Sequence, residues 1–288
     1  MNPFLRRHSF PILRLAVGCG LASAVAARAD NWAPNLTTTA TWHQNASNAD
    51  ASADEISALA LQADLLSAQR YPFGRTDALH LTAHLGGEWW PRFRGLTQGA
   101  VGGRAEWRHV FGTGPLAPSV SIEGSADAIA ARETGRRGVA TGVTLLARKR
   151  LDPRTRLSAW HEVSWLEARH ATYDRAASET TLALDRDLNE LSRLTFSVRL
   201  RDGDIVTHGT PPRADLEALA PHQLDVDTFG RPMRAYRVDA RTWSGRLAYT
   251  RALNEDAALV ASAEWRTTER ASLRFGNLLV ALAIVHQY

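Results

Sequence analysis

The segment Leu194-Thr195-Phe196-Ser197-Val198-Arg199-Leu200-Arg201 alternates strictly between apolar and polar side chains. Successive side chains of a β-strand point to opposite faces, so this segment has one apolar face and one face of Thr, Ser and Arg. Alternation of this kind recurs from about residue 78 to the last residue. The sequence therefore predicts a series of strands that each separate an oily environment from a wet one.

Twelve strands are predicted from this pattern. Their ranges are 34–45, 55–68, 77–87, 97–111, 118–131, 138–149, 155–167, 177–186, 192–202, 235–250, 256–267 and 273–288. Residues 56–66 also have the spacing of a short amphipathic helix. In the tenth strand the apolar phase slips between Val238 and Trp243, which predicts a β-bulge near Arg241. Ten and fourteen strands are the alternative counts.

A short turn motif recurs between predicted strands. It reads Leu151-Asp152-Pro153, Leu188-Asn189-Glu190 and Leu253-Asn254-Glu255, with another leucine six positions after the first in each case. Asp and Asn favour tight turns because their side chains hydrogen-bond to the local backbone. The longest irregular stretch, 202–234, contains several prolines instead. Tight turns at one end and longer loops at the other are typical of transmembrane β-barrels, and the long loop is expected to fold over or into the mouth.

Aromatic residues gather near the predicted strand ends. Trp42, Trp89, Trp90, Trp165, Trp243 and Trp265 fall at one end of the strands, and Trp107, Phe111, Tyr249 and Tyr288 fall at the other. Aromatic rings prefer the headgroup region on both sides of a bilayer. Together with the alternation, these two belts predict an all-β fold, an antiparallel up-and-down β-barrel of about twelve strands that spans a membrane. Trp160 is the exception, because its phase turns it inward.

The C-terminal strand carries a further signal. Val280, Leu282, Ile284 and Tyr288 share one face, and the chain stops at an aromatic residue. This resembles the terminal signature of bacterial outer-membrane β-barrels, although His286 departs from the apolar residue usual at its position. The resemblance is to the class as a whole and covers residues 30–288. It implies contact with outer-membrane lipid and recognition by the barrel-assembly machinery through the strand that ends at Tyr288.

Residues 1–29 have the features of a secretory signal peptide. Arg6 and Arg7 precede a small, apolar stretch at 15–27, and Ala27-Arg28-Ala29 fits a cleavage site. A twin-arginine signal is an alternative, but that route carries folded proteins. A lipoprotein site at Cys19 is another, but the apolar stretch continues well past it. The sequence therefore predicts export to the outer membrane.

Removal of this segment changes the charge balance. It takes away four of the 34 basic residues and none of the 30 acidic ones, so the high isoelectric point is no sign of nucleic-acid binding. It also removes the single cysteine, which excludes disulfides and thiolate chemistry from the mature chain. The longest apolar run after it, 278–285, has eight residues, against the roughly 18 that a membrane-spanning helix needs.

The strand phases place many charged side chains on the polar, luminal face. The predicted pore-lining residues are Arg104, Glu106, Arg108, Glu123, Asp127, Arg148, Arg193, Arg199, Arg201, Arg246, Glu264, Arg266, His80 and His84. Arg156, Glu162, Glu179 and Asp185 share this face, which gives nine bases and seven acids. Opposite charges on neighbouring strands are expected to pair. The expected partners are Arg104 and Arg108 with Glu123 and Asp127, Glu179 and Asp185 with Arg193, Arg199 and Arg201, and Arg246 with Glu264. One interpretation is that they only satisfy a wet interior, and the other is that the slight excess of Arg favours small anions.

Histidines and hydrolase motifs give no catalytic or metal site. His80 and His84 lie about 13 Å apart on one strand, too far for one ion. His161 falls on the lipid face, where a polar side chain hints at a contact with a second copy and thus a homo-oligomer. His-x-Ser and Gly-x-Ser-x-Gly are both absent. We expect no catalytic residue, metal or other cofactor.

The pattern as a whole favours a passive channel for small hydrophilic solutes, with anions preferred along Arg193, Arg199 and Arg201. The first alternative is a non-conducting barrel that serves as a surface anchor or assembly partner. The second is a membrane-embedded hydrolase, for which the sequence offers no motif. A polar lumen is compatible with all three functions, because one fold hosts many functions.

Overall fold

The computed structural model describes residues 32–288 except 211–212, 219, 227 and 271–272. It divides the chain into two units, Met1–Trp32 and Ala33–Tyr288, and every described strand and helix belongs to the second. The predicted signal peptide, residues 1–29, lies outside the described residues. Among the described residues, no helix is both long and apolar enough to cross a membrane.

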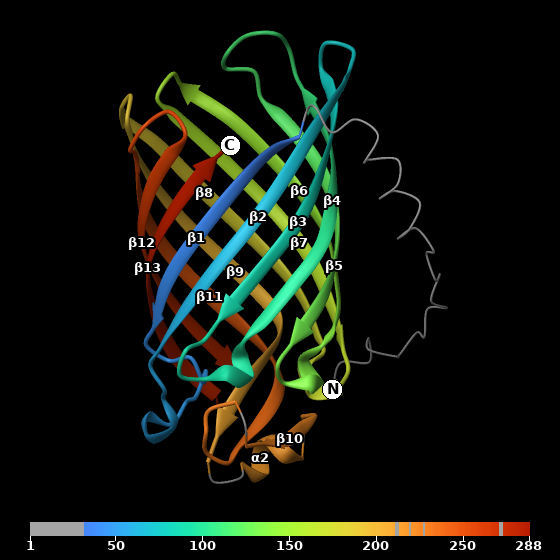
Figure 1. The fold of residues 1–288 in the computed structure, drawn as a ribbon, viewed down its shortest axis with the longest axis vertical. Helices are drawn as coiled ribbons and strands as arrows, with labels where there is room; N and C mark the ends of the chain where they lie inside the picture. The colour runs from blue at the N-terminus through green and yellow to red at the C-terminus, as the bar shows by residue number, and fades with distance from the viewer. Residues whose placement is uncertain (1–31, 211–212, 219, 227, 271–272) are drawn as a thin grey trace. The chain divides into compact units, whose positions relative to one another are not determined.

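The second unit is a closed antiparallel barrel with a wall of twelve strands (Figure 1). The wall strands are β1 (Ala33–His43), β2 (Ala58–Phe73), β3 (Asp77–Trp89), β4 (Gln98–Val110), β5 (Ser119–Ala131), β6 (Gly138–Asp152), β7 (Thr155–Ala168), β8 (Arg175–Asn189), β9 (Ser192–Gly209), β11 (Met233–Ala252), β12 (Ala257–Arg270) and β13 (Leu273–Gln287). Neighbours in sequence pair in order, and β1 pairs with β13 to close the ring. The short strand β10 (His222–Asp225) pairs only with β11.

The predicted fold class and strand number are confirmed, with two differences in detail. Residues 58–66 form part of β2, so the helical interpretation of 56–66 is wrong. The predicted bulge near Arg241 is also wrong, because β11 keeps one unbroken register with β9 from Arg234 to Arg251. The apparent slip arises because Asp239 and Arg241 are exposed polar residues in the apolar phase of the strand. Register shifts occur instead beside two of the tight turns, between Arg150 and Asp152 and between Asp187 and Asn189.

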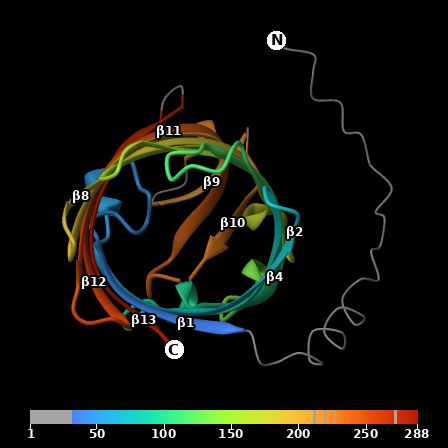
Figure 2. The ribbon, with the colours of Figure 1, turned by 90° about the horizontal axis from the view of Figure 1, so that it is seen from above.

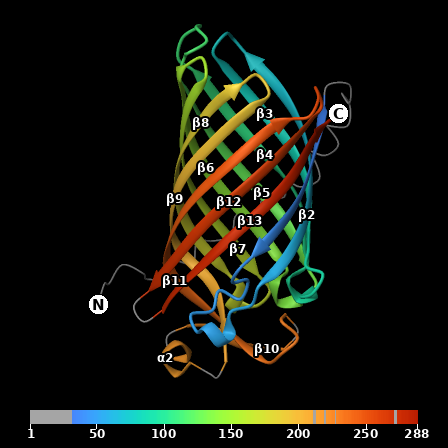
Figure 3. The same cartoon turned by 90° about the vertical axis from the view of Figure 1, so that its left-hand side faces the viewer.

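The two ends of the barrel differ, as the turn motif predicts. At the turn end, short connections such as 153–154, 190–191 and 253–256 join the strands, and β1 begins and β13 ends there. At the loop end lie four 3₁₀ turns and one helical turn. They are η2 (Ser52–Asp54), η3 (Arg94–Leu96), η4 (Thr134–Arg136), η5 (Ala171–Tyr173) and α2 (Ala214–Glu217). Figures 1 and 3 show α2 and β10 beyond the lower rim, opposite the C-terminus.

The outer face of the wall is apolar. Large side chains such as Leu85, Val101 and Leu247 are each more than half exposed, although they belong to well-ordered strands. Soluble proteins rarely expose apolar patches beyond a few hundred Å². A continuous apolar surface around the outside of the wall is therefore typical of a barrel that is surrounded by lipid. Outward tryptophans lie near the loop end of this band, and Trp107 and Tyr249 lie near the turn end. The tryptophans near the loop end are Trp42, Trp89, Trp165, Trp243 and Trp265.

Two aromatic residues leave this belt pattern. Trp90 was assigned to the belt by sequence, but it is buried in the interior of the loop end. It follows the last residue of β3, so the strand alternation no longer fixes its direction. Trp160 lies in phase with Ser158 and Glu162 and opposite in phase to the exposed Trp165, which confirms that it points inward.

Candidate functional site: the lumen and its cap

The predicted pore-lining residues share the inner face of the wall. On each strand they occupy the positions that alternate with the exposed apolar side chains, as Arg104 and Arg108 do with Val101 and Trp107 on β4. The same holds for His80 and His84 on β3, Glu123 and Asp127 on β5, Arg148 on β6, Arg193, Arg199 and Arg201 on β9, Arg246 on β11, and Glu264 and Arg266 on β12. A charged inner face and an apolar outer face thus follow from one alternation.

His84 lies between two carboxylates from other strands. Its Nδ1 is 3.1 Å from Asp127 Oδ1 on β5, and its Nε2 is 3.3 Å from Asp64 Oδ1 on β2. Room for this bridge comes from glycine, because a Cβ at Gly102 would lie 2.2 Å from Asp127 Oδ1. Sequence phasing put Asp127 beside the arginines of β4, but the register aligns it with Gly102 and brings it to His84 instead. His84 therefore ties three strands together.

Arginines pair with acids on the other side of the barrel. Arg199 Nε lies 3.3 Å from Glu179 Oε1, and Arg266 Nε lies 2.6 Å from Glu264 Oε1. Nearer the turn end, Arg193 pairs with Asp187 at 2.6 Å, and Arg156 bonds Asp185 through Nε and Nη2. The expected cross-strand pairing holds for β8 and β9. For Arg246 it does not, because Arg246 is aligned with Glu264 but donates to Ser262 Oγ.

Acidic side chains follow one another around part of the wall. The strand registers align Glu106 with Glu123, then Thr144, then Glu162 and Glu179, across β4 to β8. Glu179 is aligned in turn with Arg201 on β9. Adjacent strands lie about 4.8 Å apart, so neighbouring carboxylates in this row repel each other. Such an arrangement is tolerable where water and cations reach it, which indicates a hydrated lumen.

The loop end is covered by the described residues of the range 210–232, which we call the cap. Seen along the barrel axis, β10 and the first residues of β11 cross the ring (Figure 2). The side views place them at the rim (Figures 1 and 3). The irregular stretch is shorter at both ends than the predicted 202–234, because β9 runs to Gly209 and β11 starts at Met233. These extensions pair with each other, Gly209 with Arg234. The cap is therefore carried on a hairpin that continues the wall.

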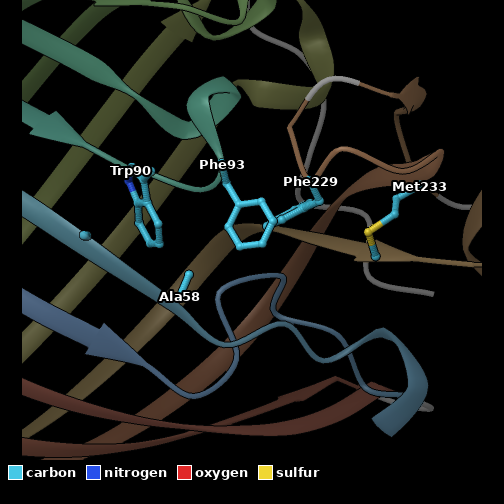
Figure 4. Close-up of a cluster of buried hydrophobic side chains, with 6 residues drawn as sticks. Ala58, Trp90, Phe93, Phe229 and Met233 are labelled. Carbon is cyan, nitrogen blue, oxygen red and sulfur yellow. The ribbon is translucent and has the colours of Figure 1, made fainter.

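Two apolar clusters hold the cap. In the first, Phe229 of the cap and Met233 pack with Trp90, Phe93 and Ala58 of the wall and its loops (Figure 4). The rings of Phe93 and Phe229 meet edge-on, with centroids 5.3 Å apart. The second cluster joins Leu216 of the cap to other strands near the rim. Its further buried members are Tyr236, Val238, Leu273 and Phe275. The loop end therefore has a core of its own, unlike the rest of the barrel.

A buried polar network fixes the cap from the side. Asp225 is only 4% exposed, and it accepts hydrogen bonds from Tyr173 Oη at 2.9 Å and the Thr228 backbone N–H at 3.0 Å. Arg136 Nη2 lies 3.8 Å from its Oδ2, and His208 Nε2 lies 3.4 Å from the same oxygen. A buried carboxylate is stable only with partners of this kind. Asp225 thus joins the cap to η4, η5 and β9.

The titration of this network follows from its contacts, all at the loop-end rim. Burial alone would raise the pKa of Asp225, but its interactions with His208 and Thr228 outweigh that effect, so the pKa lies well below its ordinary value. Burial lowers the pKa of His208 below its ordinary 6.5. Its Nδ1 lies 3.3 Å from the Ser47 carbonyl oxygen, and its Nε2 lies 3.4 Å from both Asp225 Oδ2 and Arg136 Nη2.

Asp54 in η2 anchors the two ends of the cap. Thr210, the first cap residue, donates its backbone N–H to Asp54 Oδ2 at 2.6 Å and its hydroxyl to Oδ1. Arg231, near the other end, donates from Nη2 to Asp54 Oδ1 at 3.3 Å. The cap backbone also presses on η3, where a Cβ at Gly95 would lie 2.6 Å from Thr228 Cα. The cap is therefore held by Asp54 at its two ends, by the polar network of Asp225, and by the two apolar clusters.

Sequence reasoning missed the residues of this cap contact. Asp54 and Arg136 come from the connections between β1 and β2 and between β5 and β6, while His208 lies at the end of β9 and Asp225 in the connection that follows it. No local spacing in the sequence joins these four residues. The only signal was the length of the loop. Within the described residues, no group of three or more His, Cys, Asp and Glu side chains could hold a metal ion.

Solved structures with the same fold are outer-membrane proteins. An outer-membrane channel from Pseudomonas putida F1 matches with a TM-score of 0.58 and 7% identity over 90% of this chain and 96% of that one. The KdgM porin in complex with disordered oligogalacturonate and the NanC porin both match with a TM-score of 0.47, at 7% and 5% identity, over 88% and 87% of this chain and 99% and 98% of theirs. No family model and no curated protein sequence matches the chain.

Proposed function

We propose that this chain is an outer-membrane channel that lets small hydrophilic solutes diffuse through its lumen, with the cap restricting the mouth. The observation that carries the proposal is the opposition of the two faces of the wall. The outer face exposes large apolar side chains, and the inner face carries Arg, Glu, Asp and His on nearly every strand. A wall of this kind encloses a hydrated, charged lumen that crosses the lipid bilayer. The fold shared with an outer-membrane channel agrees with this function.

The same proposal includes the location and the contacts of the chain. The apolar band contacts outer-membrane lipid, and residues 1–29 serve as the export signal. The strand β13, which ends next to Tyr288, serves as the recognition element for barrel assembly. His161 is exposed on the outer face and bonds Thr180 of β8 at 2.9 Å, so it already has one polar partner in the isolated barrel. This contact weakens the case for a second copy at that position.

A non-conducting barrel is the second candidate, and the cap is the observation that favours it. Its apolar clusters and buried ion pairs close part of the loop end. Under this alternative the loop end is a rigid surface for assembly, and the lumen carries no current.

The decisive experiment removes the cap and keeps the wall. Since Gly209 and Arg234 are directly paired, residues 210–233 can be replaced by a two-residue Asn-Gly turn that joins β9 to β11. The control shortens the turn-end connection 112–117 between β4 and β5. Each purified protein is inserted into a planar lipid bilayer and its conductance is recorded.

A channel gives discrete conductance steps in the cap-free variant, larger or more often open than those of the complete chain, whereas the control resembles the complete chain. A cap-free barrel that folds and inserts but carries no current contradicts the proposal and supports the non-conducting alternative. Folding is checked by a circular dichroism spectrum dominated by β-structure.

A further inference from the structure

The lumen holds a cavity of about 290 Å³. It is lined by side chains of β8, β9, β11, β12 and β13 together with Asn48 of the connection between β1 and β2, and Phe275 of the second apolar cluster forms part of its lining. The cavity therefore lies between the middle of the wall and the loop end.

Positive charge dominates the lining of this cavity. Four arginines line it, namely Arg175, Arg199, Arg201 and Arg266, against the two acids Glu179 and Asp204. The carboxylate of Asp204 already accepts the backbone N–H of Ala176 at 3.0 Å. The lining therefore carries two more positive than negative formal charges, the same excess as on the predicted luminal face as a whole but gathered around one cavity.

Two of these arginines face each other across a small residue. The register aligns Ser244 of β11 with Arg199 on one side and with Arg266 on the other. Adjacent strands lie about 4.8 Å apart, so the two arginine Cα atoms are roughly 10 Å apart with only a hydroxymethyl group between them. Like charges on one sheet face repel each other, and the glutamate that each arginine contacts offsets this repulsion only in part, so an anion between the two arginines would offset it further.

The arginines use only part of their hydrogen-bonding capacity. Arg199 contacts Glu179, and Arg266 contacts Glu264, each through Nε. None of the hydrogen bonds among the described residues involves an Nη group of Arg199 or Arg266 or the guanidinium of Arg175. The planar fork of guanidinium N–H groups matches the oxygens of a carboxylate or a phosphate.

Neutral hydrogen-bonding groups complete the cavity. Ser244 is buried and its hydroxyl bonds none of the described residues, while the Thr242 and Thr268 hydroxyls contact each other at 2.9 Å. Hydroxyls of this kind suit the hydroxyl groups of a polar organic molecule better than an apolar one.

We propose that this cavity is a binding site for a small hydroxylated organic anion, whose carboxylate or phosphate oxygens lie between Arg199 and Arg266. The inference rests on the proposed channel function and names the class of solute that the channel selects. The site holds the solute at the narrow, covered end of the lumen, where the arginines replace part of its hydration shell.

Binding is measured by isothermal titration calorimetry on the complete chain in detergent. The probes are gluconate for the carboxylate class, glycerol 3-phosphate for the phosphate class, and sorbitol as the neutral control. We expect at least one anion to bind at millimolar or lower concentration and sorbitol to bind at least tenfold more weakly. The stronger of the two anions identifies the acidic group.

The variant R199Q/R266Q tests the assigned residues. It is expected to weaken anion binding at least tenfold, and S244F is expected to do the same by filling the space between the arginines while both charges remain. The control R186Q/R274Q removes two arginines that also pair with one acid each, Asp152 and Glu269, outside the cavity. It is expected to bind like the unchanged chain.

Three results would overturn the inference. They are no binding of either anion, sorbitol binding as tight as that of the anions, and equal binding by R199Q/R266Q and the control in a folded state. The cap-free conductance experiment separates this failure from failure of the channel. If the barrel conducts but binds no anion, the channel function stands and the proposed binding site is wrong. If it binds an anion but carries no current, the channel function is wrong and the cavity is a binding site in a closed barrel.

Discussion

Replacement of Asp225 by Asn should release the cap. The carboxylate interacts with Tyr173, Thr228, Arg136 and His208 in a buried setting. Removal of one partner from a buried ion pair costs about 3–5 kcal/mol, because the other charge stays buried without compensation. Asn keeps an oxygen for Tyr173, so the lower value of about 3 kcal/mol applies. Since each 1.36 kcal/mol is a factor of ten, the undocked population should rise roughly 100-fold.

Trypsin sensitivity reports this population, because Arg213 lies in the cap and becomes a substrate when the cap undocks, whereas Arg231 is followed by Pro232 and is not cleaved by trypsin. While docking is fast compared with cleavage, the cleavage rate follows the undocked fraction. D225N should therefore be cut after Arg213 about 100 times faster than the unchanged chain. The control is D239N, since Asp239 is exposed and has no hydrogen bond or ion pair to the described residues. Equal cleavage of D225N and D239N would refute the reasoning.

Three further predictions follow from the same structure. Because the pKa of His208 is lowered in the docked state, the undocked state binds more protons as the pH falls below 6.5, and docking weakens on acidification. Trypsin cleavage of the cap, divided by the cleavage rate of an unstructured peptide at the same pH, should therefore rise as the pH falls below 6.5, and a flat corrected profile contradicts this. L247R places a cation on the lipid face of β11. It should lower the free energy of unfolding by about 2–4 kcal/mol when the barrel is unfolded with urea from lipid vesicles, and a change below about 1 kcal/mol argues against a lipid contact at this position. G102A places a Cβ 2.2 Å from the backbone oxygen of Ala126 and should lower the free energy of unfolding by about 1–3 kcal/mol in the same assay. The control G124A, where an added Cβ has no atom within 4 Å, should leave it unchanged, and equal effects of the two variants would mean that the close approach at Gly102 is unimportant.

The wall was predictable because its information is local. A strand of period two needs only its own residues to define an inner and an outer face, and Leu194–Arg201 contains that pattern in eight positions. Tight turns are equally local, since Asp152, Asn189 and Asn254 bond backbone atoms within two residues of themselves. These two signals were sufficient for the fold class, the strand number and the asymmetry of the ends.

Partners on the inner face were less predictable. Sequence phasing gives the face of Asp127 but not its neighbour, because the register between strands depends on the stagger of the whole barrel. The contact of His84 with Asp64 and Asp127, and the alignment of Ser244 between Arg199 and Arg266, are properties of that register.

The sequence by itself determined that the chain forms a membrane-facing barrel with a charged lumen, because alternation acts residue by residue along each strand. Only the tertiary structure decided how the loop end closes. Asp54, Arg136, His208 and Asp225 lie there together because the ring brings three separate connections and the end of β9 to one rim. Contacts between such distant segments depend on closure of the barrel, and no pattern within any one segment encodes them.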